Sequence, residues 1–465
     1  MNTRRPINEL PGPAVLSVSF SADKSLFAAG LDNGQFRVHN TKDATHEWEY
    51  DLPFHNVGKS PDGGGVAGTA ILDDKVAIFA VLGGGLRPHC AYEEFEVWEK
   101  EKLVIQCKLP GKSFQSIRMI SEAPAALPDA VVKVKYLVAA AYDLVCLYED
   151  PLIDPSGRPV LAQPEKFNTV LDNVYGLCCL SRHLLVIPSR TKGQVQLIKL
   201  KGRKEGRTIS IVRAHDGPLR ALELSRDGTL LATASTKVSG ADSRTQGTLI
   251  RVWSTINNTL LAELRRGVDP ADIFSLAISP SNRYLACTSD KGTLHIFDLR
   301  RSSSTSDQKE RRTSVTRPNL PDRSRTTSNA SSDFESVSHF DAPVGDDNAT
   351  NSTAPSPRLS TFGALQSRFV SGTTSSASRT FSVGDEPEKW QSLHPRIPNR
   401  PLPSSPEGKP PKGLIAWAND EMLHVVGGGR DPRWEQFRIV WNAEGKMVLV
   451  LDGMKRYLTD VFTDE

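Results

Sequence analysis

The chain has 465 residues, of which 38% are hydrophobic and 24% are charged, and its formal net charge is +3. This length predicts about three domains or one large repeat architecture. The near-neutral charge excludes a generally basic nucleic-acid coat, and the absence of any run of about 18 apolar residues excludes a membrane-spanning helix.

Three segments repeat one template: an apolar pair, a serine, a turn, a second apolar pair, small residues, a glycine and an alternating strand. They are residues 18–39, 222–253 and 276–297. Ser225 and Ser279 stand 54 residues apart, and residues 238–246 (VSGADSRTQ) look like a hairpin insertion. Without that insertion the spacing is about 45 residues, which is typical of a propeller blade. Each segment predicts three short strands joined by glycine-containing turns.

Weaker segments of the same kind fill the gaps between these three. They are residues 66–98, 131–148, 170–198 and 414–458. Helical periodicity is nearly absent. Three strong and four weak segments give seven blades, so the predicted fold is an all-β, seven-bladed β-propeller of the WD-repeat type.

The composition changes after Leu299. Residues 301–380 contain 30 Ser or Thr but only 11 Leu, Ile, Val or Phe. Such a segment buries too little apolar surface to offset the entropy of ordering. A proline-rich run follows, and strand-like sequence resumes at Leu414. We therefore predict propeller blades over 14–300, a long disordered insert over 301–411 and completion of the propeller over 412–460.

Motifs for catalysis or metal binding are missing from the sequence. The six cysteines lie scattered in strand-like apolar surroundings without CxxC spacing, which indicates reduced core thiols. GGGLRP (83–88) and GGGRDP (427–432) lack the Lys-Ser/Thr that completes a phosphate-cradling loop. No HExxH or GxSxG motif occurs. We expect no catalytic residue, no metal and no cofactor, and hence no enzyme.

One predicted strand, TLLAELRRG, ends in two adjacent arginines, Arg265 and Arg266. Because successive side chains of a strand point to opposite sides, the pair can serve two pockets, one on each side. Neighbouring repeats supply further polar side chains, namely His215, Lys237, Arg251, Ser289, Lys291, Thr293 and His295. Arginine forks and hydroxyls are the groups that bind a phosphate monoester. The alternative is a structural role, in which one arginine caps a strand end or pairs with Asp269.

The segment that starts with LRRG and continues as DPADIFSLAISPSNRYLACTSDKGTLHIF resembles the signature of the PROPPINs, seven-bladed propellers that bind phosphoinositides. The family's usual form is Phe-Arg-Arg-Gly, and leucine in the first place resembles its swollen-vacuole-phenotype-like branch. Other stretches that match are AHDGPLRAL, GTLIRVW, IPSRTKGQVQLI and FSADKSLFAAGLDNGQFRVHN. The predicted insert matches in position a long family loop in blade 6. The insertion 238–246, directly after Lys237, departs from the family pattern.

The resemblance implies two shallow sites on the rim, for phosphatidylinositol 3-phosphate and phosphatidylinositol 3,5-bisphosphate. The first would consist of Arg265 with His215, Ser235 and Arg251. The second would consist of Arg266 with Ser289, Lys291, Thr293 and His295. Two weak head-group contacts on one rigid disc would gain affinity through effective concentration. If His215 and His295 titrate near 6.5, a bound phosphate favours their charged form, and lipid binding should tighten from about pH 8 to about pH 6.

The implied function is that of a peripheral membrane effector in autophagy, nucleophagy and vacuolar protein transport. The resemblance implies a cytoplasmic monomer that lies on vacuole, endosome and pre-autophagosomal membranes and binds no nucleic acid. It further implies that blades 1–3 bind a lipid-transfer or scaffold protein of autophagy, with Asp23 in a matching turn. The alternative is a soluble WD-repeat scaffold that binds only proteins, with a structural arginine pair.

Within the predicted insert, LSTFGALQSRFV (359–370) could form an interfacial helix. Helical spacing places its apolar residues on one side, namely Leu359, Phe362, Leu365, Phe369 and Val370. Because Arg358 and Gln366 fall on that same side, a disordered chain with scattered apolar residues is the alternative.

Overall fold

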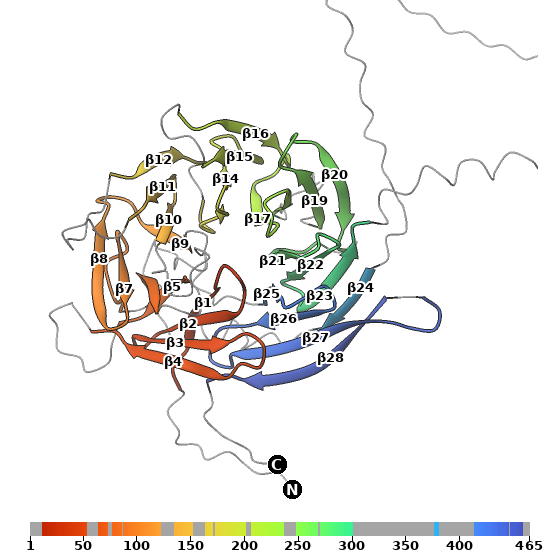
Figure 1. The fold of residues 1–465 in the computed structure, drawn as a ribbon, viewed down its shortest axis with the longest axis horizontal. Coiled ribbons are helices and arrows are strands. Elements are labelled where there is room, and N and C mark those ends of the chain that lie inside the picture. The colour runs from red at the N-terminus through yellow and green to blue at the C-terminus, as the bar shows by residue number, and fades with distance from the viewer. Residues whose placement is uncertain are drawn as a thin grey trace, which may run out of the picture. The chain divides into compact units, whose positions relative to one another are not determined.

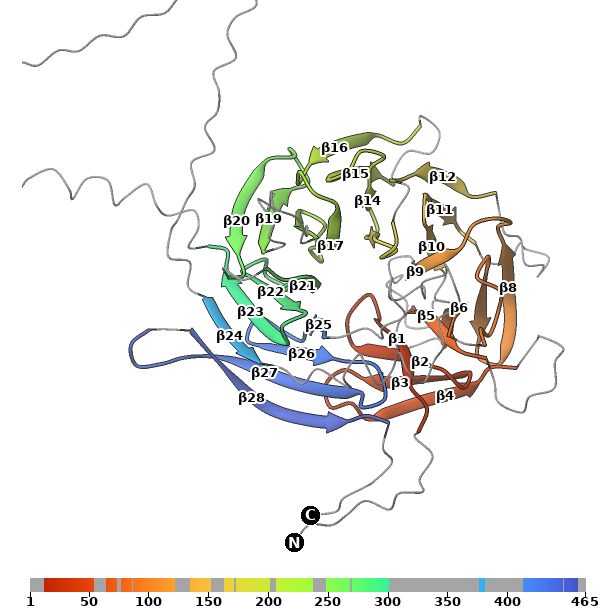
Figure 2. The ribbon, with the colours of Figure 1, turned by 180° about the vertical axis from the view of Figure 1, so that it is seen from behind.

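Seven antiparallel sheets of four strands each make up the part of the chain that the computed structural model describes. The described residues are 12–53, 64–72, 77–85, 87–121, 134–151, 163–170, 173–200, 206–236, 248–267, 270–300, 376–380, 413–445 and 447–458. Each sheet uses four strands that are consecutive in the chain, and the sheets surround a central axis as propeller blades (Figure 1, Figure 2). The predicted all-β, seven-bladed propeller is therefore confirmed.

The blades are numbered in chain order, and each runs from its innermost to its outermost strand. Blades 1 and 2 comprise β1 (Val15–Phe20), β2 (Leu26–Leu31), β3 (Gln35–Asn40), β4 (His46–Asp51), β5 (Val66–Ile71), β6 (Ile78–Gly83), β7 (Glu94–Glu99) and β8 (Lys102–Lys108). Blades 3 and 4 comprise β9 (Phe114–Ser121), β10 (Val134–Ala141), β11 (Leu144–Glu149), β12 (Glu165–Asn168), β13 (Cys179–Leu180), β14 (Leu184–Pro188), β15 (Gln194–Lys199) and β16 (Ile209–Arg213). Blades 5 and 6 comprise β17 (Leu219–Leu224), β18 (Leu230–Ser235), β19 (Leu249–Ser254), β20 (Leu260–Arg265), β21 (Ile273–Ile278), β22 (Tyr284–Ser289), β23 (Thr293–Asp298) and β24 (Ser376–Thr380). Blade 7 comprises β25 (Leu414–Trp417), β26 (Met422–Val426), β27 (Arg433–Trp441) and β28 (Met447–Arg456).

Burial decreases from the second strand of a blade to its outermost strand. In blade 1, β2 (LFAAGL) is buried at every position, β3 (QFRVHN) alternates, and β4 (HEWEYD) has no fully buried residue. Continuous apolar runs suit strands that are covered on both faces, and alternating runs suit half-covered strands. The repeat template consequently matched the first three strands of blades 1, 5 and 6. The weak segment 131–148 matched only β10 and β11, because β9 lies before it.

The hydrophobic core lies between neighbouring blades. Seven apolar clusters each combine side chains from two adjacent blades, for example blades 5 and 6 through Leu264 and Leu285. The last blade is joined to the first in the same way, and Val15 and Gly429 exchange two backbone hydrogen bonds of 2.9 Å. All six cysteines are free and buried, as predicted.

The span predicted to be an insert contains one strand of the propeller. β24 pairs with β23 and forms the outermost strand of blade 6, with Thr380 opposite Thr293. Contacts divide the chain into two compact units, Met1–Ser304 with Gly372–Glu465, and Thr305–Ser371. The propeller belongs to the first unit, and the second contains no described residue. The predicted apolar side of 359–370 therefore lies outside the described residues, and the limits 301 and 411 stay predictions.

Candidate functional site

The two adjacent arginines lie at the end of the outermost strand of blade 5. Arg265 is the last residue of β20 and pairs with Leu249, while the Arg266 amide donates to the Thr248 carbonyl at 2.9 Å. Arg265 is exposed, whereas Arg266 is only 8% exposed. Since side chains alternate along a strand, Arg265 shares one side of the sheet with Glu263, and Leu264 packs on the other side against blade 6. Arg266 likewise reaches blade 6.

We define the blade 5/6 cluster as Arg266, Ser289, Thr293 and His295. Its centre is the Thr293 hydroxyl, which accepts a hydrogen bond from Arg266 Nη2 at 3.1 Å. Ser289 Oγ lies 3.1 Å and His295 Nε2 lies 3.2 Å from the same oxygen. Ser289 ends β22 and Thr293 begins β23, so the hairpin between these strands brings the two hydroxyls together. The structure therefore gathers four of the five residues predicted for the second site.

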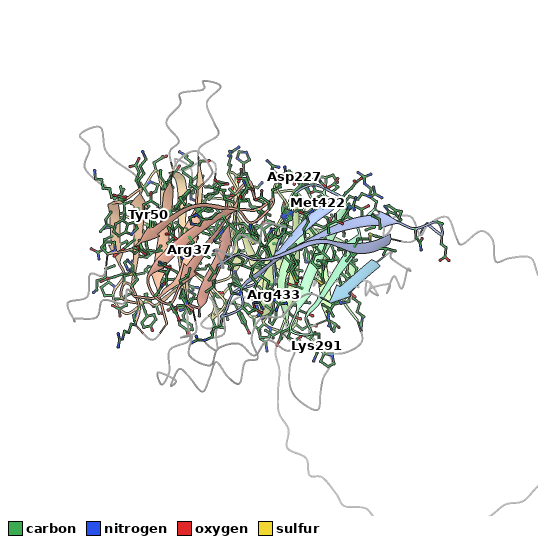
Figure 3. All side chains as sticks on the ribbon, turned by 90° about the horizontal axis from the view of Figure 1, so that it is seen from below. Arg37, Tyr50, Asp227, Lys291, Met422 and Arg433 are labelled. Carbon is green, nitrogen blue, oxygen red and sulfur yellow. The ribbon has the colours of Figure 1, made fainter. Side chains whose placement is uncertain are left out.

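Lys291 is the fifth predicted residue of that site and lies at the tip of the same hairpin. Its side chain is exposed and has no hydrogen bond or ion pair among the described residues. Figure 3 views the disc from its side and places Lys291 on one face and Asp227 on the opposite face. The cluster thus has a buried arginine and three polar groups, with a flexible lysine beside them on the surface.

Charge and burial determine the protonation of His295. Burial, followed by the positive charge of Arg266, lowers the pKa of His295 from 6.5 to about 4. The imidazole is therefore neutral at physiological pH, and it neutralises none of the charge of a phosphate. The assumption that this histidine titrates near 6.5 is corrected, because a buried ring beside a guanidinium resists protonation.

We define the blade 4/5 cluster as Ser235, Arg251, Glu263 and Arg265. Arg251 Nε forms an ion pair with Glu263 Oε2 at 2.9 Å, and Arg251 Nη1 donates to the Ala214 carbonyl at 2.6 Å. Ala214 belongs to the connection from blade 4, so Arg251, Glu263 and Arg265 lie on the side that faces blade 4. Ser235 ends β18 and is 4% exposed. Lys237 and the insertion 238–246, predicted to border this site, lie outside the described residues.

His215 is bound into the interior of blade 5. Its Nε2 lies 2.9 Å from the Thr233 hydroxyl, which also accepts a hydrogen bond from Trp253 Nε1 at 3.2 Å. Burial, followed by the charge of Arg251, lowers the pKa of His215 from 6.5 to about 4. The ring is 8% exposed, and its contacts are those of a residue that fixes the connection between two blades. No sequence pattern points to Thr233 and Trp253, because they meet His215 only where β18 and β19 pack against the connection from blade 4.

The two clusters occupy equivalent positions in their blades. In the strand pairing, Arg251 lies opposite Thr233 and His295 lies opposite Cys287, so Arg251 and His295 correspond. By the same register Ser235 corresponds to Ser289, and Leu249 corresponds to Thr293. The blade 5/6 cluster therefore has a hydroxyl where the blade 4/5 cluster has an apolar side chain.

Within the described ranges, no group of three or more His, Cys, Asp or Glu side chains could hold a metal ion. No helix in the described part of the chain is long and apolar enough to cross a membrane.

Comparison with known sequences assigns a family to this architecture. The PROPPIN family profile matches residues 144–316, and the profile of the WD domain, G-beta repeat, matches residues 4–40. SVP1-like protein 2 of Neurospora crassa is 33% identical to the chain, and the alignment covers 98% of the chain and 99% of that protein. Autophagy-related protein 18e of Arabidopsis thaliana is 42% identical over 134 residues, which cover 28% of the chain and 32% of that protein.

Comparison with solved structures supports the fold. The crystal structure of Hsv2 from Kluyveromyces marxianus matches with a TM-score of 0.58 at 17% identity, and it covers 96% of the chain and 100% of the solved chain. At this level of identity the match concerns the fold alone.

Proposed function

The chain belongs to the PROPPIN family, and on that premise we propose that it is a phosphoinositide-binding peripheral membrane protein of autophagy. The finer proposal is that it binds phosphatidylinositol 3-phosphate and phosphatidylinositol 3,5-bisphosphate and acts in nucleophagy and vacuolar protein transport. The observation that carries the proposal is the blade 5/6 cluster. A guanidinium and two further polar groups, from Ser289 and His295, converge there within 3.1–3.2 Å of the Thr293 hydroxyl.

A phosphate group suits the blade 5/6 cluster chemically. A phosphate monoester carries between one and two negative charges and three strong acceptor oxygens. Arg266 supplies forked donors, and the Ser289 and Thr293 hydroxyls rotate to donate. Lys291 adds an exposed positive charge beside these groups. We assign Arg266, Ser289, Lys291, Thr293 and His295 to this head-group site, with His295 as a neutral donor.

The blade 4/5 cluster is our second proposed head-group site. Arg265 is exposed and has no ion pair among the described residues, so it is available to an anion. Arg251 must first release Glu263 to contribute. His215 Nε2 already contacts the Thr233 hydroxyl, so we assign His215 a supporting role at this site rather than direct contact with the head group. We retain Arg265, Ser235 and Arg251 as its ligands.

Localisation on vacuole, endosome and pre-autophagosomal membranes follows from lipid binding and stays part of the proposal. The protein partner on blades 1–3 is proposed on family grounds. Asp23, at the β1–β2 hairpin, uses Oδ1 to accept hydrogen bonds from Ser21 Oγ at 2.6 Å and the Ser25 amide at 3.1 Å. Its carboxylate thus stabilises its own turn, and its second oxygen could face a partner.

Flotation with liposomes tests the proposed function. Wild-type protein should float with vesicles that contain phosphatidylinositol 3-phosphate and stay unbound with pure phosphatidylcholine. Arg265→Thr with Arg266→Thr should abolish flotation, because each arginine loses charge-assisted hydrogen bonds of roughly 1.5–3 kcal/mol. A double variant that floats as well as wild type would favour the soluble WD-repeat scaffold instead.

A further inference from the structure

Blade 4 repeats the arrangement of the two proposed sites at its side facing blade 3. Arg213 ends β16 and lies opposite Gln194, as Arg265 ends β20 and lies opposite Leu249. Gln196 lies opposite Ile187 and thus takes the place of Arg251 and His295. Ser189 follows β14 in the place of Ser235 and Ser289, and it is 6% exposed. We define Ser189, Gln194, Gln196 and Arg213 as the blade 3/4 cluster.

The position of Gln196 shows which way this cluster faces. Gln196 Nε2 donates to the Asn168 carbonyl at the end of β12, at 3.1 Å. Asn168 belongs to blade 3, so Gln196 lies on the side of blade 4 that faces blade 3. Gln194 and Arg213 share that side, because they lie two residues from Gln196 and from Ile211, its partner in the sheet.

Three cations at this end of blade 4 have no carboxylate partner among the described residues. Arg190 and Lys192 on the β14–β15 hairpin and Arg213 are all exposed. Among the described residues none of the three has a hydrogen bond or an ion pair from its side chain. Cations at the equivalent strand ends of other blades are neutralised: Lys108 pairs with Glu94 at 2.9 Å, and Arg456 pairs with Asp431 at 2.8 Å. The exposed cations of blade 4 therefore resemble Arg265 rather than ordinary strand ends.

Exposed apolar side chains continue from the cations along the outermost strand of blade 4. Ile209 and Ile211 are 47% and 55% exposed, and they lie on the same side of β16 as Arg213. A strand that presents a cation at its end and large apolar side chains behind it suits the boundary between lipid head groups and acyl chains. Figure 1 shows β16 and β20 as neighbouring outer strands, so blade 4 alone separates this surface from the proposed site of Arg265.

We propose that the blade 3/4 cluster, with Arg190 and Lys192, is a third binding site for the phosphate monoester of a phosphoinositide head group. The inference rests on the proposed function, because it extends the same strand-end position from blades 5 and 6 to blade 4. Arg213 and Lys192 supply the charge, Ser189 and Gln194 supply polar contacts, and Ile211 faces the lipid.

The test compares two double variants of the full chain that remove equal charge from blade 4. Lys192→Thr with Arg213→Thr changes the proposed site, and Arg182→Thr with Lys199→Thr changes exposed cations at the opposite end of the same blade. Affinity is measured for vesicles that contain phosphatidylinositol 3-phosphate and for vesicles with phosphatidylserine of equal total charge. We expect the first variant to bind phosphoinositide vesicles at least about tenfold more weakly and the control to bind like wild type.

Each outcome decides a separate point. Equal affinities of the two variants would overturn the third site, and loss of binding in Arg265→Thr with Arg266→Thr would still uphold the proposed function. An equal loss on phosphatidylserine vesicles would also overturn it, because the cluster would then add only general attraction. Binding of soluble inositol 1,3-bisphosphate shows whether the site takes a free phosphate compound or the head group of a membrane lipid. Ile211→Ser should weaken vesicle binding and leave binding of the soluble head group unchanged. If the variant leaves both affinities unchanged, Ile211 does not face lipid and a lipid ligand is contradicted.

Discussion

The blade 5/6 and blade 4/5 clusters occupy equivalent places in adjacent blades and differ in what surrounds the arginine. In the blade 5/6 cluster, Arg266 donates to the hydroxyl of Thr293 and is buried. In the blade 4/5 cluster, Arg251 is held by Glu263 and by a backbone carbonyl, and Arg265 is exposed. In the first, three groups already surround the Thr293 hydroxyl, whereas in the second Arg251 is paired with an internal carboxylate and only Arg265 is open to solvent. One repeated scaffold therefore gives two proposed sites, of which the first is pre-organised and the second is internally compensated.

The largest expected effect comes from deleting the outermost strand of blade 6, the blade that supplies Ser289, Thr293 and His295 to the blade 5/6 cluster. Replacing residues 301–411 with a short linker removes β24, whose five residues pair with β23. Because each net backbone hydrogen bond contributes about 1 kcal/mol, we expect a loss of roughly 3–5 kcal/mol in the free energy of unfolding. Replacing only 305–371 should leave stability unchanged. Urea unfolding followed by circular dichroism measures both, and equal stability of the two deletions would show that β24 contributes nothing to the blade.

The next largest effect is expected for the single arginine variants. Arg266→Thr should weaken phosphoinositide binding by roughly 10- to 100-fold, since it removes the forked donor of the pre-organised cluster. Arg265→Thr should cost less, because Arg265 is exposed and screened by solvent. Surface plasmon resonance on supported bilayers can measure both affinities. A larger loss for Arg265→Thr would reverse the ranking of the two clusters.

The pH dependence distinguishes folding from binding. His215 and His295 both have a pKa near 4 in the folded chain, against 6.5 when unfolded. Below pH 6.5 the unfolded state binds more protons, so the free energy of unfolding falls as pH is lowered from about 6.5 to about 4. It is unaffected by these groups above pH 6.5. The slope is at most about 1.4 kcal/mol per pH unit for each histidine.

Lipid affinity should accordingly stay flat between pH 8 and pH 6, in contrast to the expectation from free histidine. Urea unfolding at several pH values should show a shallower acid slope for His295→Gln than for wild type. If vesicle affinity rises toward pH 6 and the rise disappears in His295→Gln, bound phosphate charges this histidine and the neutral-donor assignment is wrong.

The smallest expected effect concerns the hydroxyl that distinguishes the two clusters. Thr293→Val keeps the shape and removes the hydroxyl, and it should weaken head-group binding by about fivefold, equivalent to about 1 kcal/mol. The converse change, Leu249→Thr, supplies a hydroxyl at the equivalent place in blade 5 and should tighten binding slightly. Titration calorimetry with a short-chain soluble phosphoinositide can resolve these differences. Unchanged affinity in Thr293→Val would remove the hydroxyl from the site.

The sequence alone determined the repeat and the positions of the site residues that lie in it. Apolar pairs, glycine turns and alternating runs are local, because burial on two faces or on one face is recorded within five or six residues of a strand. The alternation that separates Arg265 from Arg266 is local for the same reason. Six buried cysteines and seven blades followed from such local patterns.

The tertiary structure alone decided which side chains meet. β24 pairs with β23 across more than 70 intervening residues, and its sequence SASRT carries no apolar pattern to identify it. His215 was expected to bind phosphate, and the structure places it in the connection between blades 4 and 5, against Thr233, where burial lowers its pKa. Pairing of β19 with β20 sets Arg251 opposite Glu263, and packing of blade 5 against blade 6 brings Arg266 to Thr293. Register between strands fixes these contacts, and register depends on the packing of whole blades, which no short stretch of sequence contains.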